Sequence, residues 1–158
     1  MKKLLIPLLL ILMLTSCGSS DVQKKRPDFS VNASVEFKYM DSEYSADVRT
    51  SSDGTVTMTV TSPEDISGIV FVCSADEITA RCGNVKIPCE NGYIPFTQLY
   101  KILSFAESSV PAAIEAEDEI NVFEYYSNGD RYVISADAET DRIIRIETPV
   151  CIYSLTVD

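Results

Sequence analysis

Residues 95–108 read Pro-Phe-Thr-Gln-Leu-Tyr-Lys-Ile-Leu-Ser-Phe-Ala-Glu-Ser, and this stretch decides the fold. Its apolar residues recur at the helical spacings of three and four, and they are Phe96, Leu99, Tyr100, Ile102, Leu103, Phe105 and Ala106. The polar stripe between them is narrow and consists of Thr97, Lys101, Ser104 and Ser108. A helix with so wide an apolar face must be covered on most sides. The pattern therefore predicts a largely buried helix near residues 96–108.

The chain on both sides of this helix alternates apolar and polar residues, which is typical of half-buried strands. The clearest run, Thr-Val-Thr-Met-Thr-Val-Thr over 55–61, puts three apolar residues on one face. The pairs Asp53-Gly54 and Asn128-Gly129 are typical of tight hairpin turns. Residues 109–118, with Pro111 and a run of acids, indicate a connection. The predicted strands lie around 35–39, 44–48, 55–61, 66–73, 77–82, 83–88, 119–126, 131–137, 142–148 and 150–157.

The order of these elements predicts the architecture. An open sheet of about ten strands curls, and a helix that is apolar on most sides is buried only if the sheet wraps around it. We therefore expect a mainly β fold with one helix (α+β). It is a curved antiparallel sheet of about ten strands that forms a half-barrel around the helix near residues 96–108.

The N-terminus indicates export. A short positive start is followed by an apolar run from Leu4 to Leu14, which is too short to span a bilayer and has the length of a secretory signal. The run ends in Leu14-Thr15-Ser16-Cys17, which resembles the lipobox of bacterial lipoproteins. This resemblance implies that a diacylglycerol is attached to Cys17 and that the chain is cleaved before it. The alternative is an ordinary secretory signal with a chance cysteine.

The predicted organisation has three parts: a signal peptide over 1–16, the lipidated Cys17 with a flexible tether over 17–30, and one domain over 31–158. Two acyl chains hold a protein stably on a membrane, so we expect a lipid-anchored protein on the extracytoplasmic side of the cell membrane. The cluster Lys24-Lys25-Arg26 either lies close to anionic headgroups or is a solvated part of the tether.

The charge of the domain limits its partners. Residues 31–158 contain 8 basic and 22 acidic residues, a net charge of −14, which repels nucleic acid and excludes it as a partner. The acidic surface is either a solubility feature or a surface for a cationic partner. The acidic stretches 115–119 and 137–141 lack the spacing of an EF-hand calcium loop, so we expect solvated turns and no metal site.

The residues contain no catalytic constellation. There is no histidine in the chain, so Ser-His-Asp and Cys-His sites are absent. There is also no Gly-rich phosphate loop. We expect no enzyme activity and no cofactor. Four cysteines follow Cys17, and they are either disulfide-bonded, in one of three pairings, or free buried thiols: Cys73, Cys82, Cys89 and Cys151.

Several stretches resemble the lipoprotein-carrier (LolA-like) fold, and in particular the lipoproteins of Gram-positive anaerobes that are built on it. These stretches are Glu43–Val48, Met58–Ile69, Gly83–Tyr100, Gly129–Asp137 and Asp141–Ile146. The resemblance covers most of 33–157 and implies a half-barrel that binds rather than catalyses. Gram-negative carriers begin with a helix, whereas residues 18–30 here are a polar tether.

Two functions are consistent with these patterns. In the first, the concave face borders a cavity for an apolar or lipid-like ligand, with Phe96, Leu99, Tyr100 and Leu103 from the helix in its wall. A cavity above about 300 Å³ favours this interpretation. In the second, aromatic side chains fill the core, and the domain is a non-catalytic surface interaction or structural module without a ligand. The protein partner of such a module is unknown.

The lipid anchor is testable in cells. A fatty-acid probe is expected to label the wild-type chain and not the Cys17→Ala variant, because only the thiol of Cys17 can carry the thioether. The measurement is probe incorporation into the immunoprecipitated chain, normalised to its amount. Equal incorporation into both chains would overturn the anchor.

Overall fold

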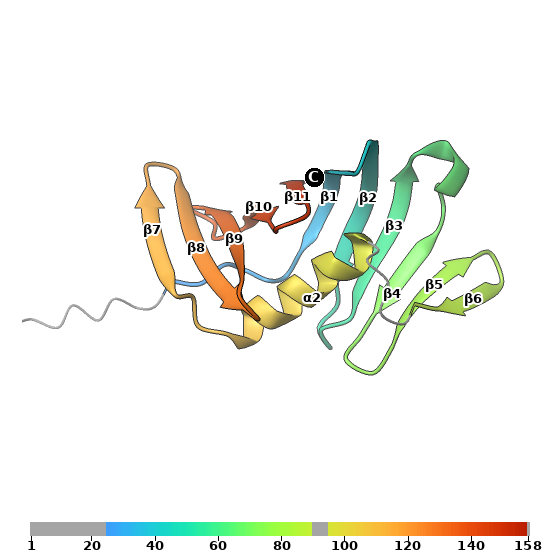
Figure 1. Cartoon of the computed structure of the whole chain (residues 1–158), viewed down its shortest axis with the longest axis horizontal. Coiled ribbons are helices and arrows are strands. Elements are labelled where there is room, and N and C mark those ends of the chain that lie inside the picture. Colours follow the sequence, from blue (N-terminus) through green and yellow to red (C-terminus); the bar gives the residue numbers. More distant parts are fainter. Residues whose placement is uncertain (1–24, 90–94, 158) are drawn as a thin grey trace, which may run out of the picture.

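The α-helix α2 (Pro95–Ser108) lies in the concave side of a curved antiparallel sheet (Figure 1). The computed structural model describes residues 25–89 and 95–157. Within these residues the sheet has eleven strands in the order β6-β5-β4-β3-β2-β1-β11-β10-β9-β8-β7. The prediction of a mainly β fold, with a half-barrel around one helix, is confirmed. The predicted signal peptide and Cys17 lie outside the described residues.

The first six strands run from the centre of the sheet to one edge, and the last five run from the other edge back to the centre. The first half consists of β1 (Asn32–Tyr39), β2 (Ser42–Thr50), β3 (Val56–Ser62), β4 (Val70–Cys73), β5 (Ile78–Cys82) and β6 (Val85–Pro88). The second half consists of β7 (Ala113–Glu117), β8 (Ile120–Ser127), β9 (Asp130–Asp137), β10 (Ile143–Glu147) and β11 (Ile152–Thr156). The two halves join where β1 pairs with β11 in antiparallel register.

The alternation in each strand sets the two faces of the sheet. Val56, Met58 and Val60 of β3 are buried, whereas Thr57 and Thr59 between them are partly exposed. Cross-strand register keeps apolar residues on the same concave face, because directly opposed residues point to one side of a sheet. Thus Met58 pairs with Val48 of β2 and with Phe71 of β4.

The Asn128-Gly129 turn has the geometry that its sequence predicts. Both residues have positive φ, 53° and 90°, as a two-residue hairpin of the type I′ class requires. The turn joins β8 to β9 with Ser127 opposite Asp130. A side chain at position 129 would be strained whatever the space around it, because of this φ.

The structure corrects the prediction for residues 109–118. Ala113–Glu117 is not a connection but the edge strand β7, which pairs along its whole length with β8. Ile114 lies opposite Phe123 on the concave face, while Glu115 and Glu117 occupy the alternate positions. An edge strand needs only one covered face, and charged side chains are common on such edges. The acidic composition that suggested a loop is therefore compatible with a strand.

The predicted strand 66–73 is also shorter in the structure. Glu64–Ile66 forms a short 3-10 helix, η1, and the strand β4 begins at Val70. Gly68 has a φ of 85°, and its N–H donates to the carbonyl of Val60. The turn thus uses a backbone N–H group that a longer β4 would need for regular hydrogen bonds to β3.

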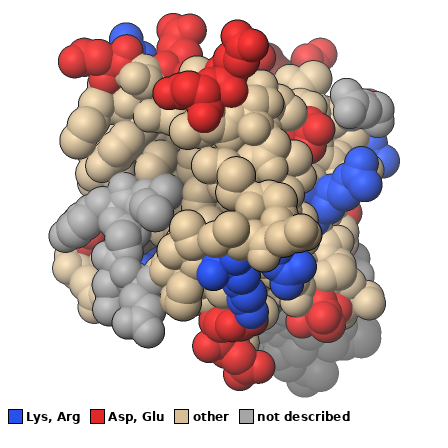
Figure 2. All heavy atoms as spheres, turned by 90° about the vertical axis from the view of Figure 1, so that its right-hand side faces the viewer, with Lys and Arg blue, Asp and Glu red and all other residues tan. Residues whose placement is uncertain are grey.

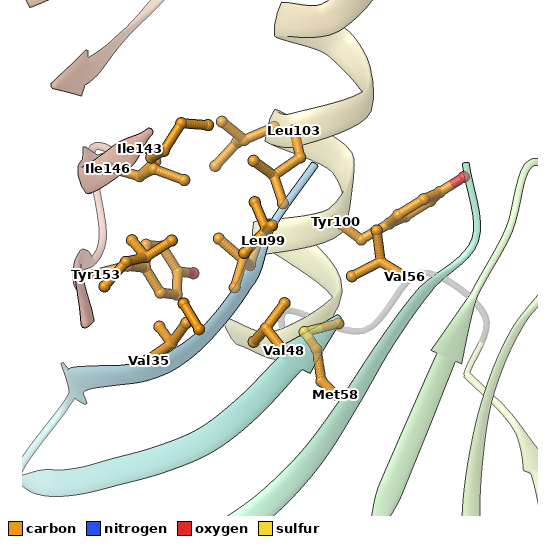
Figure 3. Packing of buried hydrophobic residues seen from close by; sticks show 14 of the residues in the cluster. Val35, Val48, Val56, Met58, Leu99, Tyr100, Leu103, Ile143, Ile146 and Tyr153 are labelled. Carbon is orange, nitrogen blue, oxygen red and sulfur yellow. The ribbon is translucent and has the colours of Figure 1, made fainter. Parts of the chain in front are cut away.

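Helix α2 contributes several buried residues to the core. Leu99 is 1% exposed and Leu103 is buried with it, and both project from α2 toward the sheet (Figure 3). Val35, Val48 and Met58 lie opposite them. Burying a leucine side chain contributes about 1.5–3 kcal/mol, so this contact accounts for a large share of the stability of the fold.

Replacing Leu99 by alanine is expected to lower the free energy of unfolding by about 2–5 kcal/mol, because the packed sheet cannot close the space left behind. The matched control is Lys101→Ala, on the exposed side of the same helix, with an expected change within about 0.5 kcal/mol. Urea denaturation followed by circular dichroism measures both. A Leu99→Ala chain that unfolds at the wild-type urea concentration would contradict the buried position of α2.

Candidate functional site

The four helix residues predicted to border a ligand cavity lie on one face of α2, but the structure places them in two different surroundings. All four are buried: Phe96, Leu99, Tyr100 and Leu103. Phe96 and Leu99, in the N-terminal half of the helix, lie within the packed core. Tyr100 and Leu103, further along, line a cavity between the helix and the β2–β3 turn.

An aromatic cluster fills the space around the N-terminal half of α2. The ring of Phe96 stacks on Phe71, with centroids 4.7 Å apart, and meets Phe37 edge-on at 5.1 Å. Tyr44 meets Phe96 edge-on and stacks on Phe37. Such pairs add about 0.5–1.5 kcal/mol beyond the area they bury. This end of the helix is therefore held by β1, β2 and β4 together.

A buried hydrogen bond fixes the same end of the helix. The hydroxyl of Tyr153, on β11, donates to the backbone carbonyl of Pro95 at 2.8 Å. Burial raises the pKa of Tyr153, so the hydroxyl keeps its proton at every physiological pH and remains a donor. The bond ties the start of α2 to the centre of the sheet.

The cavity beside the C-terminal half of α2 has a volume of about 170 Å³. Residues from the helix, from the β2–β3 and β4–β5 turns and from the segment before β1 line it: Phe29, Thr50, Asp53, Gly54, Val56, Ala75, Tyr100, Leu103, Ser104 and Glu107. Figure 3 shows the Tyr100 ring projecting from α2 toward Val56. The sequence predicted Tyr100 and Leu103 here but missed Asp53 and Phe29, because chain turns rather than helical spacing bring them to the site. Helical spacing does point to Glu107, four residues after Leu103.

The charge at the rim of this cavity is negative. The carboxylate of Asp53 accepts hydrogen bonds from the Ser51 hydroxyl at 2.7 Å and from the Thr55 N–H at 3.0 Å. These bonds, that of Ser51 first, lower the pKa of Asp53, so it is ionised at neutral pH. Burial raises the pKa of Tyr100, whose hydroxyl is therefore neutral there.

The segment before β1 lies against the domain. The Lys25 ammonium group donates to the carbonyl of Ala138 at 2.6 Å, and the Asp28 N–H donates to the carbonyl of Asp141 at 2.7 Å. Phe29 then reaches the cavity beside α2. The end of the predicted tether thus contributes one wall of the candidate site.

Two other hollows lie away from α2. One, of about 400 Å³, is mostly polar and lies over β1, β2 and β11, with Glu36, Lys38 and Glu43 in its wall. The other, of about 190 Å³, lies where the segment before β1 meets the domain, beside Asp28 and Arg142. Neither contains a residue of the helix, so neither bears on the predicted site.

The face that carries β5 and β6 is mostly uncharged at its centre and carries charges around it (Figure 2). On the edge strand β6, Val85 and Ile87 are 59% and 53% exposed. Cys82 is exposed, Cys89 is half-buried, and Cys73 and Cys151 are buried, and all four are free thiols. Burial raises the pKa of the Cys73 thiol to about 12, which removes its nucleophilic form at neutral pH.

In the part of the chain that the structure describes, no group of three or more cysteine, aspartate or glutamate side chains is placed to hold a metal ion. A search of the same residues for helices that are long and apolar enough to cross a membrane finds none.

Among known proteins, the chain is similar only to solved structures. No family model and no curated protein matches the chain. A LolA superfamily protein from Nitrosomonas europaea matches with a TM-score of 0.35 and 10% identity. The match covers 73% of this chain and 61% of that protein. The lipoprotein LppX of Mycobacterium tuberculosis matches with a TM-score of 0.38 and 10% identity, covering 78% of this chain and 84% of LppX. Both likenesses concern the fold alone.

The Tyr153→Phe variant is expected to lose about 1 kcal/mol of unfolding free energy, because the Pro95 carbonyl loses a buried donor. Tyr125→Phe is the matched control, since its ring is equally buried and the described residues offer its hydroxyl no hydrogen bond. Thermal unfolding of the two variants measures the difference. Equal melting temperatures would show that the bond to Pro95 does not stabilise the start of α2.

Proposed function

We propose that the chain is a membrane-anchored extracytoplasmic protein that binds an apolar or lipid-like ligand on the concave face of its sheet, beside α2. The observation that carries this proposal is the cavity bordered by Tyr100 and Leu103. Ligand sites are concave and mostly apolar, with a few polar groups. The wall here is about equally polar and apolar: Val56, Leu103 and Ala75 are in the apolar part, and the hydroxyl and carboxyl groups of the turn and the helix are in the polar part.

The size of the cavity limits what enters it. An apolar cavity of about 150 Å³ holds one benzene ring, and pockets for whole drug-sized ligands measure about 300–1,000 Å³. At about 170 Å³, the cavity is below the volume of about 300 Å³ that would favour a site for a whole ligand, and it accepts one ring or a short aliphatic end of a larger molecule. The rest of such a ligand extends past Ser104 and Glu107 into solvent, or toward the membrane to which the N-terminus is anchored.

A larger apolar group requires α2 to move away from the turn. The sheet does not depend on the helix for its backbone hydrogen bonds, since each strand pairs with its neighbours. The C-terminal half of α2 lies beyond the aromatic cluster that holds Phe96. An outward shift of this half would separate Phe105 from the rings of Tyr125 and Tyr132, while Tyr153 and the cluster hold the start of the helix.

The membrane anchor in this proposal rests on the sequence Leu14-Thr15-Ser16-Cys17. A ligand site on a tethered domain stays within a short distance of the bilayer. Lys25, where the chain meets the domain, is eight residues after Cys17, and eight residue steps span at most about 28 Å. Phe29, close to this point of contact, lines the cavity. The site is therefore near enough to the membrane to exchange an apolar ligand with it.

A second candidate function has a specific observation in its favour. Phe96 and Leu99 are almost fully buried, as are Met58 and Tyr153 opposite them. Side chains fill the core around the first half of α2, as expected of an interaction or structural module without a ligand. In that case the cavity is a small packing defect beside the turn.

Wild-type chain is expected to bind the neutral apolar dye N-phenyl-1-naphthylamine saturably, with a rise in fluorescence. Leu103→Trp should weaken binding roughly 10- to 100-fold, because its ring takes the place of an apolar group worth about 1.5–3 kcal/mol. Leu103→Met, which conserves volume, is the control and should bind as wild type does.

The same variants separate the two candidate functions. If the cavity is a true site, Leu103→Trp should be less destabilising than Leu99→Trp, because overpacking a filled core costs about 1–3 kcal/mol. No saturable uptake by the wild type, together with equal destabilisation by the two tryptophans, would reject the binding function and favour the interaction module.

A further inference from the structure

We propose that the cavity beside α2 selects a cationic amphiphile, that is, a quaternary ammonium or amine group attached to an apolar group. This inference rests on the proposed function and names the chemical class of its ligand. Three properties of the cavity wall support it independently: the sign of its charges, its aromatic rings and its apolar part.

The charges in the wall have one sign. Asp53 and Glu107 are the charged side chains among the residues that line the cavity, and none of those residues is basic. Asp53 comes from the β2–β3 turn and Glu107 from the last turn of α2, so the carboxylates approach the cavity from two elements. A fatty acid or a lipid phosphate entering here would meet two like charges, which are repulsive at close range.

The carboxylate of Asp53 is held in place before any ligand arrives. Its hydrogen bonds to the Ser51 hydroxyl and the Thr55 N–H fix its position in the turn. These bonds leave its negative charge at the rim, and the lowered pKa of Asp53 keeps that charge at mildly acidic pH. A fixed charge attracts a cation without the entropy loss of ordering a flexible side chain.

Aromatic rings provide the second attraction. Tyr100 and Phe29 both line the cavity, one from the helix and the other from the segment before β1. The face of an aromatic ring attracts organic cations, and aromatic side chains are the usual recognition element for quaternary ammonium groups. Rings together with carboxylates discriminate such a cation from a neutral group of the same size.

The apolar part of the wall accepts the rest of the ligand. Val56, Leu103 and Ala75 contribute aliphatic groups to a volume of about 170 Å³, near that of a benzene-sized cavity. The domain as a whole assists, because a net charge of −14 over residues 31–158 raises the local concentration of cations. A benzyl group attached to a trimethylammonium head has the size and charge that this wall fits.

The test compares three probes that share one ring. The full chain in a neutral maltoside detergent is titrated with benzyltrimethylammonium, benzyl alcohol and phenylacetate, and saturation-transfer NMR gives each dissociation constant. The cation is expected to bind about three- to tenfold more tightly than the neutral alcohol, and phenylacetate should bind most weakly.

A charge-removing variant assigns the effect to the cavity. Glu107→Gln should weaken the cation about three- to tenfold and leave benzyl alcohol unchanged. Glu107 is chosen because replacing Asp53 would also break the hydrogen bonds of the turn. The control, Glu64→Gln, removes the same charge from η1, at the far end of β3, about 20 Å from the turn. It should change nothing.

Failure of this inference is distinguishable from failure of the proposed function. Equal binding of the cation and the alcohol, unchanged by Glu107→Gln, would overturn cation selectivity and leave an apolar site. The cation could also bind more tightly than the alcohol but be weakened equally by Glu64→Gln and Glu107→Gln. The preference would then come from the overall charge of the domain, and the inference would be overturned as well. If none of the ring probes binds but the neutral dye does, the cavity is not a cation site. If the dye also fails to bind, the proposed function falls as well.

Discussion

The apolar surface of α2 must be kept out of water, and the rest of the structure depends on how this is done. One sheet covers the helix, so it has to be both wide and curved. Eleven strands supply the width. The pairing of β1 with β11 makes the two halves one continuous surface. Without that pairing, each half would cover one side of the helix, and the contacts of Leu99 would be exposed along the junction.

The same constraint explains which features of the fold were predictable. The period of three and four in residues 96–108 and the period of two elsewhere are local, and they led to a helix in a curved antiparallel sheet. The edge strand β7 was missed, because its outward-facing glutamates have the composition of a loop and its pairing with β8 is a tertiary property. The start of β4 was placed too early for a similar reason. The bond from the Gly68 N–H to Val60 depends on two strands being brought together.

The candidate site was predictable in part. Helical spacing puts Tyr100 and Leu103 on one face with Phe96 and Leu99, but it cannot tell which pair meets a void. That depends on the side chains opposite, which come from strands and turns far away in the sequence. Asp53 belongs to a hairpin turn and Phe29 to the segment before β1, so neither has a local pattern that marks it as part of a site. A cavity wall assembled from four separate segments is visible only in the folded chain.

The sizes of the facing side chains determine where the cavity lies. Opposite the first half of α2, the aromatic rings of Phe37, Tyr44 and Phe71 fill the space beneath the helix. Beside the second half, the ring of Phe105 contacts Tyr125 and Tyr132 on one side. On the side of the β2–β3 turn, the facing residues are Val56, Ala75 and Gly54, which are much smaller. The helix is about 21 Å long, so the two halves meet different surroundings while sharing one rigid axis. Space that aromatic rings fill beside the first half of the helix stays free between its second half and the β2–β3 turn. At this cavity, the turn places the carboxylate of Asp53, which its hydrogen bonds hold in position, at the rim. The cavity and the negative charge at its rim thus lie on the same side of the second half of the helix.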